Sequence, residues 1–295
     1  MTKRNRKIAL VEGTLAGVSF GTAAIFIRLI GDFNDYSIAF WRLIIAISAL
    51  GAIFLVSRKS FEHYKVRENV RQFIILGILL GLHFILFVSA VRDTTILNAT
   101  VLVNTTAIFS MLISSFLFKV KPSYAAVIGI FISFLGVGII AFADVSPSAL
   151  SERRLIGDFE ALLAAVVEGF YLNYGREVRG KLPLIPLMIM IYSMSALTVA
   201  ATSVAASNPL TFTVSQPSLI LYLIGLGIVP TAFAHTFYFS SLSHLKSYET
   251  ATMALLEPIG ATLLGIAVFN EIPNPFFIIG AFLVLCGIFS VVTTR

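Results

Sequence analysis

The segment LLEPIG, residues 255–260, places a glutamate and a proline side by side within a long apolar run. An ionised Glu257 that faced lipid would cost about 2.5–3.5 kcal/mol or more. Pro258 has no backbone N–H to donate to the carbonyl of Ala254, so it is expected to bend the helix. Two such residues at membrane depth predict a polar interior that protein or a water-filled cavity shields from lipid.

The composition around this segment is that of a polytopic membrane protein. Of the 295 residues, 58% are hydrophobic and 12% are charged. Apolar runs of about 20 residues recur along the chain, and each is long enough to cross about 30 Å of bilayer hydrocarbon. We therefore predict an all-α fold with ten transmembrane helices. The predicted spans are residues 8–30, 36–57, 72–91, 97–118, 123–143, 156–175, 184–206, 218–241, 248–269 and 275–293.

Basic residues lie mainly on one side of the predicted membrane. If the N-terminus is inside, sixteen lysines and arginines lie on inner loops and tails, while only Arg92, Arg153 and Arg154 lie outside. Arg28 and Arg42 fall within spans. This asymmetry predicts a multi-pass plasma-membrane protein with cytoplasmic N- and C-termini. It also accounts for the formal net charge of +6 without a nucleic-acid partner.

The sequence repeats itself at a nearly constant offset. An offset of 148 places Arg28 on Arg176. An offset of 151 matches a phenylalanine, a proline and two glycines, which are Phe118, Pro122, Gly129 and Gly136 against Phe269, Pro273, Gly280 and Gly287. The chain is therefore predicted to contain two five-span units, residues 1–146 and 147–295. Because five is odd, the second unit enters from the opposite side, as in transporters with inverted repeats.

Residues 231–274 resemble the EamA branch of the drug/metabolite transporter superfamily. This stretch reads TAFAHTFYFSSLSHLKSYETATMALLEPIGATLLGIAVFNEIPN, in which Thr231, Glu257, Pro258 and Glu271 occupy the positions of the family pattern. The first half adds FWRLIIAISAL, with Arg42 at the family's second-span arginine. The resemblance covers essentially the whole chain. It implies ten spans in two inverted halves and a role in exporting small metabolites.

The first half departs from this pattern, and so does the sixth span. The offset of 151 places Thr106 opposite Glu257, and the offset of 148 places Phe20 opposite Glu168. Glu168 stands where many relatives carry tryptophan. At these two pairs of positions the acidity therefore belongs to the second half alone.

Glu168 and Glu257 are the main candidates for contact with substrate or protons. Glu257 lies about 14 Å and Glu168 about 16 Å into their predicted spans, both near the bilayer midplane. Two carboxyls that face one cavity are not expected both to be ionised, so one could exchange a proton. The alternatives are structural. Glu257 could be a neutral helix-packing group beside a kink, and Glu168 could pair with Arg42 or His83.

Further polar and aromatic residues at depth complete the candidate site. His83, Thr231 and Asn104 could line a cavity or serve packing, whereas His235 is expected nearer the inner surface. Tyr171 shares a helix face with Glu168. Aromatic candidates for stacking on a substrate are Phe20 and Trp41. The candidates for a structural or gating role are Pro258, Pro230 and Arg42.

Two classes of function remain open from the sequence. The favoured one is a secondary transporter of small organic solutes, which exports amino acids or related metabolites through a central cavity, with proton coupling as a further hypothesis. The alternative is a membrane-embedded enzyme or lipid-handling protein that uses the buried Glu and His residues. No zinc pair or phosphate loop is present in the sequence, so neither a cofactor nor a metal is expected. The expected partners are the small-molecule substrate and the lipid bilayer. The oligomeric state, a monomer included, is left open.

Overall fold

The helices follow the order of the apolar runs. The computed structural model describes residues 5–31, 33–57, 67–142, 152–212, 216–269 and 275–293, which form helices and no strands. The helices before residue 143 are α1 (Arg6–Phe20), α2 (Ala23–Leu29), α3 (Asp35–Val56), α5 (Val70–Asp93), α6 (Ile96–Val103), α7 (Thr106–Phe116) and α8 (Tyr124–Phe142). Those after residue 151 are α9 (Glu152–Arg179), α10 (Leu184–Ala205), α11 (Pro217–Leu226), η1 (Gly227–His235), α12 (Thr236–Ser241), α13 (Ser247–Met253), η2 (Ala254–Leu256), α14 (Glu257–Phe269) and α15 (Phe276–Thr293).

Polar residues set where several of these helices begin. The Asn34 side chain accepts a hydrogen bond from the Ser37 N–H at 2.8 Å, and the Thr95 hydroxyl accepts one from the Asn98 N–H at 3.0 Å. Such caps satisfy N–H groups that have no partner inside the helix. Pro217 is the first residue of α11, where its missing N–H costs nothing.

Within the described residues, seven helical stretches are long and apolar enough to cross a membrane, and each coincides with a predicted span. They are Arg6–Leu29, Asp35–Val56, Val70–Asp93, Asn98–Phe116, Leu184–Ala205, Pro217–Ser241 and Phe276–Thr293. Tyr124–Ile140 is a shorter apolar helix. The 28 residues of α9 include charged residues near both ends. The chain is thus an all-α polytopic membrane protein, while the exact count of ten spans stays a prediction.

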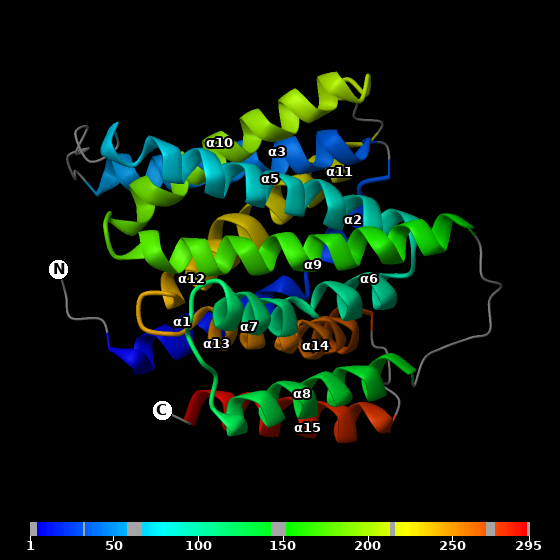
Figure 1. The fold of residues 1–295 in the computed structure, drawn as a ribbon. Coiled ribbons are helices and arrows are strands. Elements are labelled where there is room, and N and C mark those ends of the chain that lie inside the picture. The colour runs from blue at the N-terminus through cyan, green and yellow to red at the C-terminus, as the bar shows by residue number, and fades with distance from the viewer. Residues whose placement is uncertain are drawn as a thin grey trace.

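The long helices lie side by side in Figure 1. There α10, α3 and α5 run along the upper side, α9 crosses the middle, and α1, α7, α13 and α14 lie below it. The α5 helix packs against α9 and α10, and α8 pairs with α15 at the lower edge. Large apolar side chains such as Leu55, Phe116 and Phe289 are exposed on the outside of the bundle. This surface suits contact with lipid.

The start of α1 and the end of α15 lie at the same end of the bundle (Figure 1). Arg6 at the start of α1 donates to the Val292 carbonyl near the end of α15 at 2.8 Å. Arg6 also pairs with the buried Glu249 of α13 at 2.6 Å. Which side of the membrane this end faces stays a prediction. Eight residues on which the sequence analysis depends lie outside the described residues. They are Glu271, Pro273 and six of the basic residues counted on the inner side, namely Lys3, Arg4, Arg58, Lys59, Lys65 and Arg295.

Glycines bring α1 into backbone contact with the end of α13 and with α14. A Cβ atom on Gly17 would collide with the Met253 carbonyl oxygen, and one on Gly260 would collide with the Val18 carbonyl oxygen. Gly21 lies at the break between α1 and α2, where a Cβ atom would be 2.8 Å from the Glu257 carbonyl oxygen. Small residues thus let the first predicted span cross the ninth at closest approach.

Contacts between α8 and α15 follow the sequence offset of 151. Gly129 lies against the backbone of Gly287, and Gly136 lies against the backbone of Gly280. Adding 151 to Gly129 gives Gly280, and adding 151 to Gly136 gives Gly287, so the offset turns each of these two contacts into the other. An approximate twofold axis between α8 and α15 would have the same effect. This exchange supports the proposal of two repeats. The proposed boundary between residues 146 and 147 lies outside the described residues.

A pair of arginines follows the same relation at the helix ends. Arg28 donates to the Thr94 carbonyl, and Arg176 donates to the Leu245 carbonyl at 3.1 Å. Positions 94 and 245 are 151 residues apart, and the two arginines are 148 residues apart, so the two offsets of the proposed repeat relate these contacts. In an inverted pair of repeats these two contacts belong to opposite ends of the bundle.

The close crossing of α1 predicts that one added methyl group is harmful. We expect Gly17→Ala to lower the apparent Tm of the detergent-solubilised protein, since overpacking costs about 1–3 kcal/mol. The matched control is Gly51→Ala on α3, where a Cβ atom would meet nothing within 4 Å. Equal melting temperatures for the two variants would contradict the tight crossing.

The basic asymmetry predicts the orientation in the membrane. On a Cys286→Ala background, we expect Ala206→Cys to react with an impermeant maleimide added to intact cells. Ser57→Cys should react only after permeabilisation, because position 57 follows α3 on the side of the membrane that is predicted to be cytoplasmic. Both replaced positions are exposed, at the ends of α10 and α3. The opposite labelling pattern would reverse the proposed topology.

Candidate functional site

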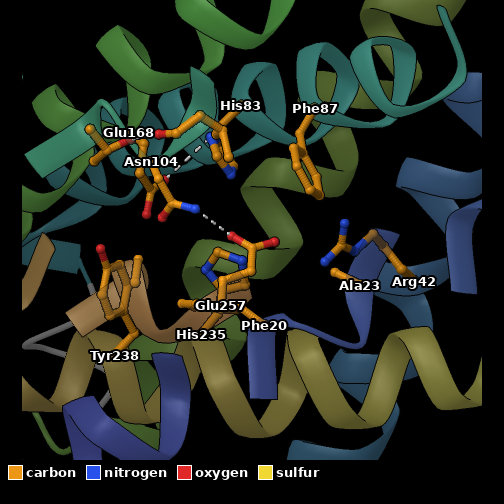
Figure 2. A pocket seen from close by; sticks show the side chains of 13 residues that line it. Phe20, Ala23, Arg42, His83, Phe87, Asn104, Glu168, His235, Tyr238 and Glu257 are labelled. Atoms are coloured by element: carbon orange, nitrogen blue, oxygen red, sulfur yellow. Dashed lines mark hydrogen bonds and ion pairs between the residues drawn. The ribbon is translucent and has the colours of Figure 1, made fainter. Parts of the chain in front are cut away.

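A small polar cavity lies inside the bundle, with a volume of about 50 Å³ (Figure 2). A water molecule needs roughly 10–15 Å³ by this measure, so the cavity has room for a few waters. Its apolar lining includes Phe20, Ala23, Phe87, Val103 and Ala254. Its polar lining is formed by Arg42, His83, Asn104, Thr106, Glu168, His235, Tyr238 and Glu257. All of these polar side chains are buried.

The cavity lies where regular helix is interrupted. The first predicted span breaks between α1 and α2, just after Phe20, and the fourth breaks between α6 and α7 at Asn104. The eighth contains the π-helix η1, which ends at His235, and the ninth contains the 3-10 turn η2 just before Glu257. Interrupted helices at membrane depth are tolerated where protein or a cavity covers them. In transporters such breaks often surround the substrate site.

Glu257 is the first residue of α14 and is held from the opposite half of the chain. The Asn104 amide donates to its Oε2 at 3.1 Å and to the Thr100 carbonyl at 2.7 Å. The Ala254 carbonyl, which cannot bond to Pro258, accepts from the Glu257 N–H instead. Pro258 therefore stands in the first turn of a new helix, where proline is well tolerated.

Glu168 faces His83 across the interface of α9 and α5. The His83 Nδ1 lies 3.6 Å from the Glu168 Oε2 and 3.1 Å from the Ala164 carbonyl oxygen, to which it can donate. Glu168 Oε2 has no hydrogen-bond partner within the described residues. Of the two structural partners expected for Glu168, the geometry places His83 beside it.

Arg42 enters the cavity from α3 and is only 1% exposed. Its Nε donates to the Thr231 hydroxyl at 2.9 Å, and its guanidinium carbon lies 4.0 Å from the centroid of the Phe84 ring. Pro230 has no N–H for the Leu226 carbonyl four residues earlier, and the Thr231 hydroxyl donates to that carbonyl at 2.7 Å. The proline in η1 thus helps to position the threonine that holds Arg42.

Three of the residues expected in the site do not line the cavity. Thr231 lies behind Arg42 and holds its Nε. Tyr171 is fully buried and packs on Phe239, with ring centroids 5.5 Å apart. Trp41 points away toward Thr211, whose carbonyl accepts from the indole N–H at 2.9 Å. Although Trp41 and Arg42 are adjacent, a helix turns successive side chains about 100° apart, so only one faces the cavity.

His235, Tyr238 and Phe87 line the cavity without having been predicted there. His235 was expected nearer the inner surface, yet its ring centroid lies 4.8 Å from that of Phe20 and 6.1 Å from that of His83. The wider turns of η1 change the register of the helix, so counting residues at 3.6 per turn misplaces the side chains after Pro230. The proline inside η1, Pro230, is a local signal of this irregularity.

Within the described ranges, no three His, Cys, Asp or Glu side chains are grouped so that they could hold a metal ion.

An apolar helical bundle with interrupted helices around a buried cavity is the arrangement found in many secondary transporters. The chain belongs to the EamA-like transporter family, whose sequence profile matches residues 7–142 and 155–293. The matches occupy two separate segments of similar length, one before and one after residues 143–154.

Two relatives agree with this assignment. An uncharacterized transporter of Archaeoglobus fulgidus is 24% identical over 90% of each chain. The uncharacterized transporter YxxF of Bacillus subtilis is 21% identical over 97% of this chain and 90% of its own. A crystal structure matches 98% of this chain and 97% of its own with a TM-score of 0.77 at 17% identity, which shows the fold alone.

The contacts of Arg42 predict a specific role for the Thr231 hydroxyl. We expect Thr231→Val to lower the apparent Tm, because it leaves buried groups on Arg42 and Leu226 without a partner at a cost of about 1–3 kcal/mol. Thr231→Ser keeps the hydroxyl and is the matched control. If valine is tolerated as well as serine, the hydroxyl does not hold Arg42.

Proposed function

We propose that the protein is a secondary transporter that exports amino acids or related small metabolites across the plasma membrane. The observation that carries this proposal is the cavity itself, which brings Glu168 and Glu257 together with Arg42 among interrupted helices. In this proposal the N- and C-termini are cytoplasmic, and the protein moves its substrate without altering it chemically. Export of small metabolites is also the role that the family resemblance implies.

Alternating access requires the cavity to widen toward each side in turn. At about 50 Å³ the cavity is far smaller than the ~300–1,000 Å³ of typical small-molecule pockets. Ion pairs tie the helices at both ends of the bundle. Arg6 and Glu249 pair at 2.6 Å at the end with the termini, and Arg92 and Asp35 pair at 2.6 Å between α5 and α3 at the other. In our proposal the described state is closed, and opening breaks the contacts of one end at a time.

The interrupted helices suit such a movement. A regular helix resists bending because each backbone group is bonded within it, whereas a break concentrates the change at a few residues. The breaks at Gly21 and Asn104 lie in the first half, and those at η1 and η2 lie in the second. Movement at these points changes the shape of the cavity directly, since residues at or next to each break line it.

Proton coupling is the further part of the proposal. Glu168 faces His83, and Glu257 faces Asn104 with Arg42 across the cavity. An intramembrane carboxyl without a permanent cationic partner can be neutral in one state of the cycle and ionised in another. We propose that at least one of the two carboxyls gains and loses a proton during transport.

Glutamine substitutions separate ionisation from packing. We expect Glu168→Gln to reduce amino acid flux in proteoliposomes by about tenfold or to remove its pH dependence, with a smaller effect for Glu257→Gln, which also begins a helix. Flux is to be measured from about pH 5 to about pH 8, with and without an imposed proton gradient. The recovered solute is analysed by mass spectrometry to show that it is unchanged.

Glu160→Gln is the matched control for these variants. Glu160 lies on the same helix as Glu168, is half-buried and accepts from Ser89 at 2.8 Å, but it does not line the cavity. We expect this variant to transport like the parent. Parent-like flux from both cavity variants at every pH would overturn proton coupling through these carboxyls.

A further inference from the structure

Arg42 is a buried guanidinium without a carboxylate partner. Within the described part of the chain, no carboxylate oxygen lies within 4.0 Å of its nitrogens, although arginines elsewhere in the bundle have such partners. Arg42 is nevertheless almost fully buried, with 1% of its surface exposed. An arginine side chain stays charged in proteins, and a buried charge without a partner is strongly unfavourable. A ligand that supplies the missing negative charge would remove this cost.

The guanidinium is held so that its free side faces the cavity. Thr231 accepts from Nε at 2.9 Å, and the Phe84 ring lies under the guanidinium plane at 4.0 Å. Nη1 has no hydrogen-bond partner within the described residues. Figure 2 shows the terminal nitrogens directed into the space between Phe87 and Glu257. A planar guanidinium group held in this way matches a carboxylate, which can accept two parallel hydrogen bonds from it.

The wall of the cavity opposite Arg42 carries an acidic side chain, that of Glu257. Figure 2 shows the Glu257 carboxyl facing Arg42 across the cavity, while Asn104 bonds its Oε2 at 3.1 Å. A simple anion bound at Arg42 would leave the acidic wall without a cation, and a simple amine would leave Arg42 without an anion. A molecule that carries a carboxylate and an ammonium group a few bonds apart satisfies both walls at once.

We propose that Arg42 binds the carboxylate of the substrate and that Glu257 receives its ammonium group. Arg42 is thereby a specificity-determining residue, and the substrates are amino acids with both groups free. This inference rests on the proposed transport function and specifies how the cavity of that function selects its solute. The Thr231, Pro230 and Phe84 contacts act by positioning the guanidinium.

The inference is tested with matched solutes on the parent protein. Proteoliposomes are given L-alanine, L-leucine and L-phenylalanine, the amide of each, and the deamino acid of each. We expect at least one amino acid to be transported. The transport rates of its amide and of its deamino acid, the carboxylic acid without the amino group, should each be lower by about tenfold or more, which corresponds to roughly 1.4 kcal/mol in binding. The amide removes the group that Arg42 binds, and the deamino acid removes the group that Glu257 receives.

The arginine itself is tested by Arg42→Lys. Lysine keeps the charge but cannot form the bidentate pair, so we expect KM for the transported amino acid to rise by about tenfold and the preference over the amide to shrink. The matched control is Arg28→Lys, because Arg28 lies at a helix end and donates to the Val91 and Thr94 carbonyls outside the cavity. If Arg42→Lys fails to fold, the solute selectivity of the parent protein decides the question.

The outcomes separate this inference from the function on which it rests. Transport of an amide as fast as its amino acid would overturn the role of Arg42 and leave amino acid transport standing. Transport of a deamino acid as fast as its amino acid would support Arg42 and overturn the role of Glu257. If no solute of the panel moves, both the proposed amino acid transport and this inference fail.

Discussion

The need of every backbone N–H and C=O group for a partner within lipid determines the layout of this protein. A continuous helix satisfies this need by itself, whereas an interrupted helix depends on its neighbours. The interruptions next to Phe20, at Asn104, in η1 and in η2 all lie at the cavity. The continuous helices α3, α5 and α9 cover this region from the other sides and contribute Arg42, His83 and Glu168 to it. The polar centre is thus a consequence of where the helices are allowed to break.

Close packing of backbones makes the arrangement of the cavity possible. Because Gly17 and Gly260 have no side chain, α1 lies directly against the end of α13 and against α14. This contact brings the break at Gly21 beside Glu257, so the two irregular regions share one space. On the opposite side, the missing N–H of Pro230 is linked through Thr231 to Arg42. Glycines and a proline, which have no reactive side chains, therefore position the charged residues of the cavity.

The charges of the cavity explain its proposed selectivity better than any single residue does. Arg42, Glu168 and Glu257 share one buried space, but only Glu168 has an oppositely charged or chargeable partner within 4.0 Å, His83, in the described part of the chain. Charges that are buried without direct partners are costly for a structure that only has to be stable. They are useful to a structure that has to bind a charged solute and release it again.

Much of the site could be read from the sequence because a strongly polar or ionisable residue in an apolar run is conspicuous. Glu257, Glu168, His83, Asn104 and Arg42 are polar residues of this kind, and all five line the cavity. Phe20, found through the repeat, does so as well. Trp41, Tyr171 and Thr231 were chosen by depth and residue type, which do not say toward which neighbour a side chain points. His235, Tyr238 and Phe87 were missed for the same reason, and His235 also because η1 is not a regular α-helix.

The sequence by itself determined the membrane class, the positions of the apolar helices and the presence of charge at mid-depth. These follow from the length of apolar runs and from the cost of burying polar groups, which depend on neighbours along the chain. Only the tertiary structure decided which polar groups meet, because Asn104 and Glu257 are 153 positions apart and Arg42 and Thr231 are 189 apart. The rotation of each helix about its axis settles such pairs, and that rotation is set by packing between helices.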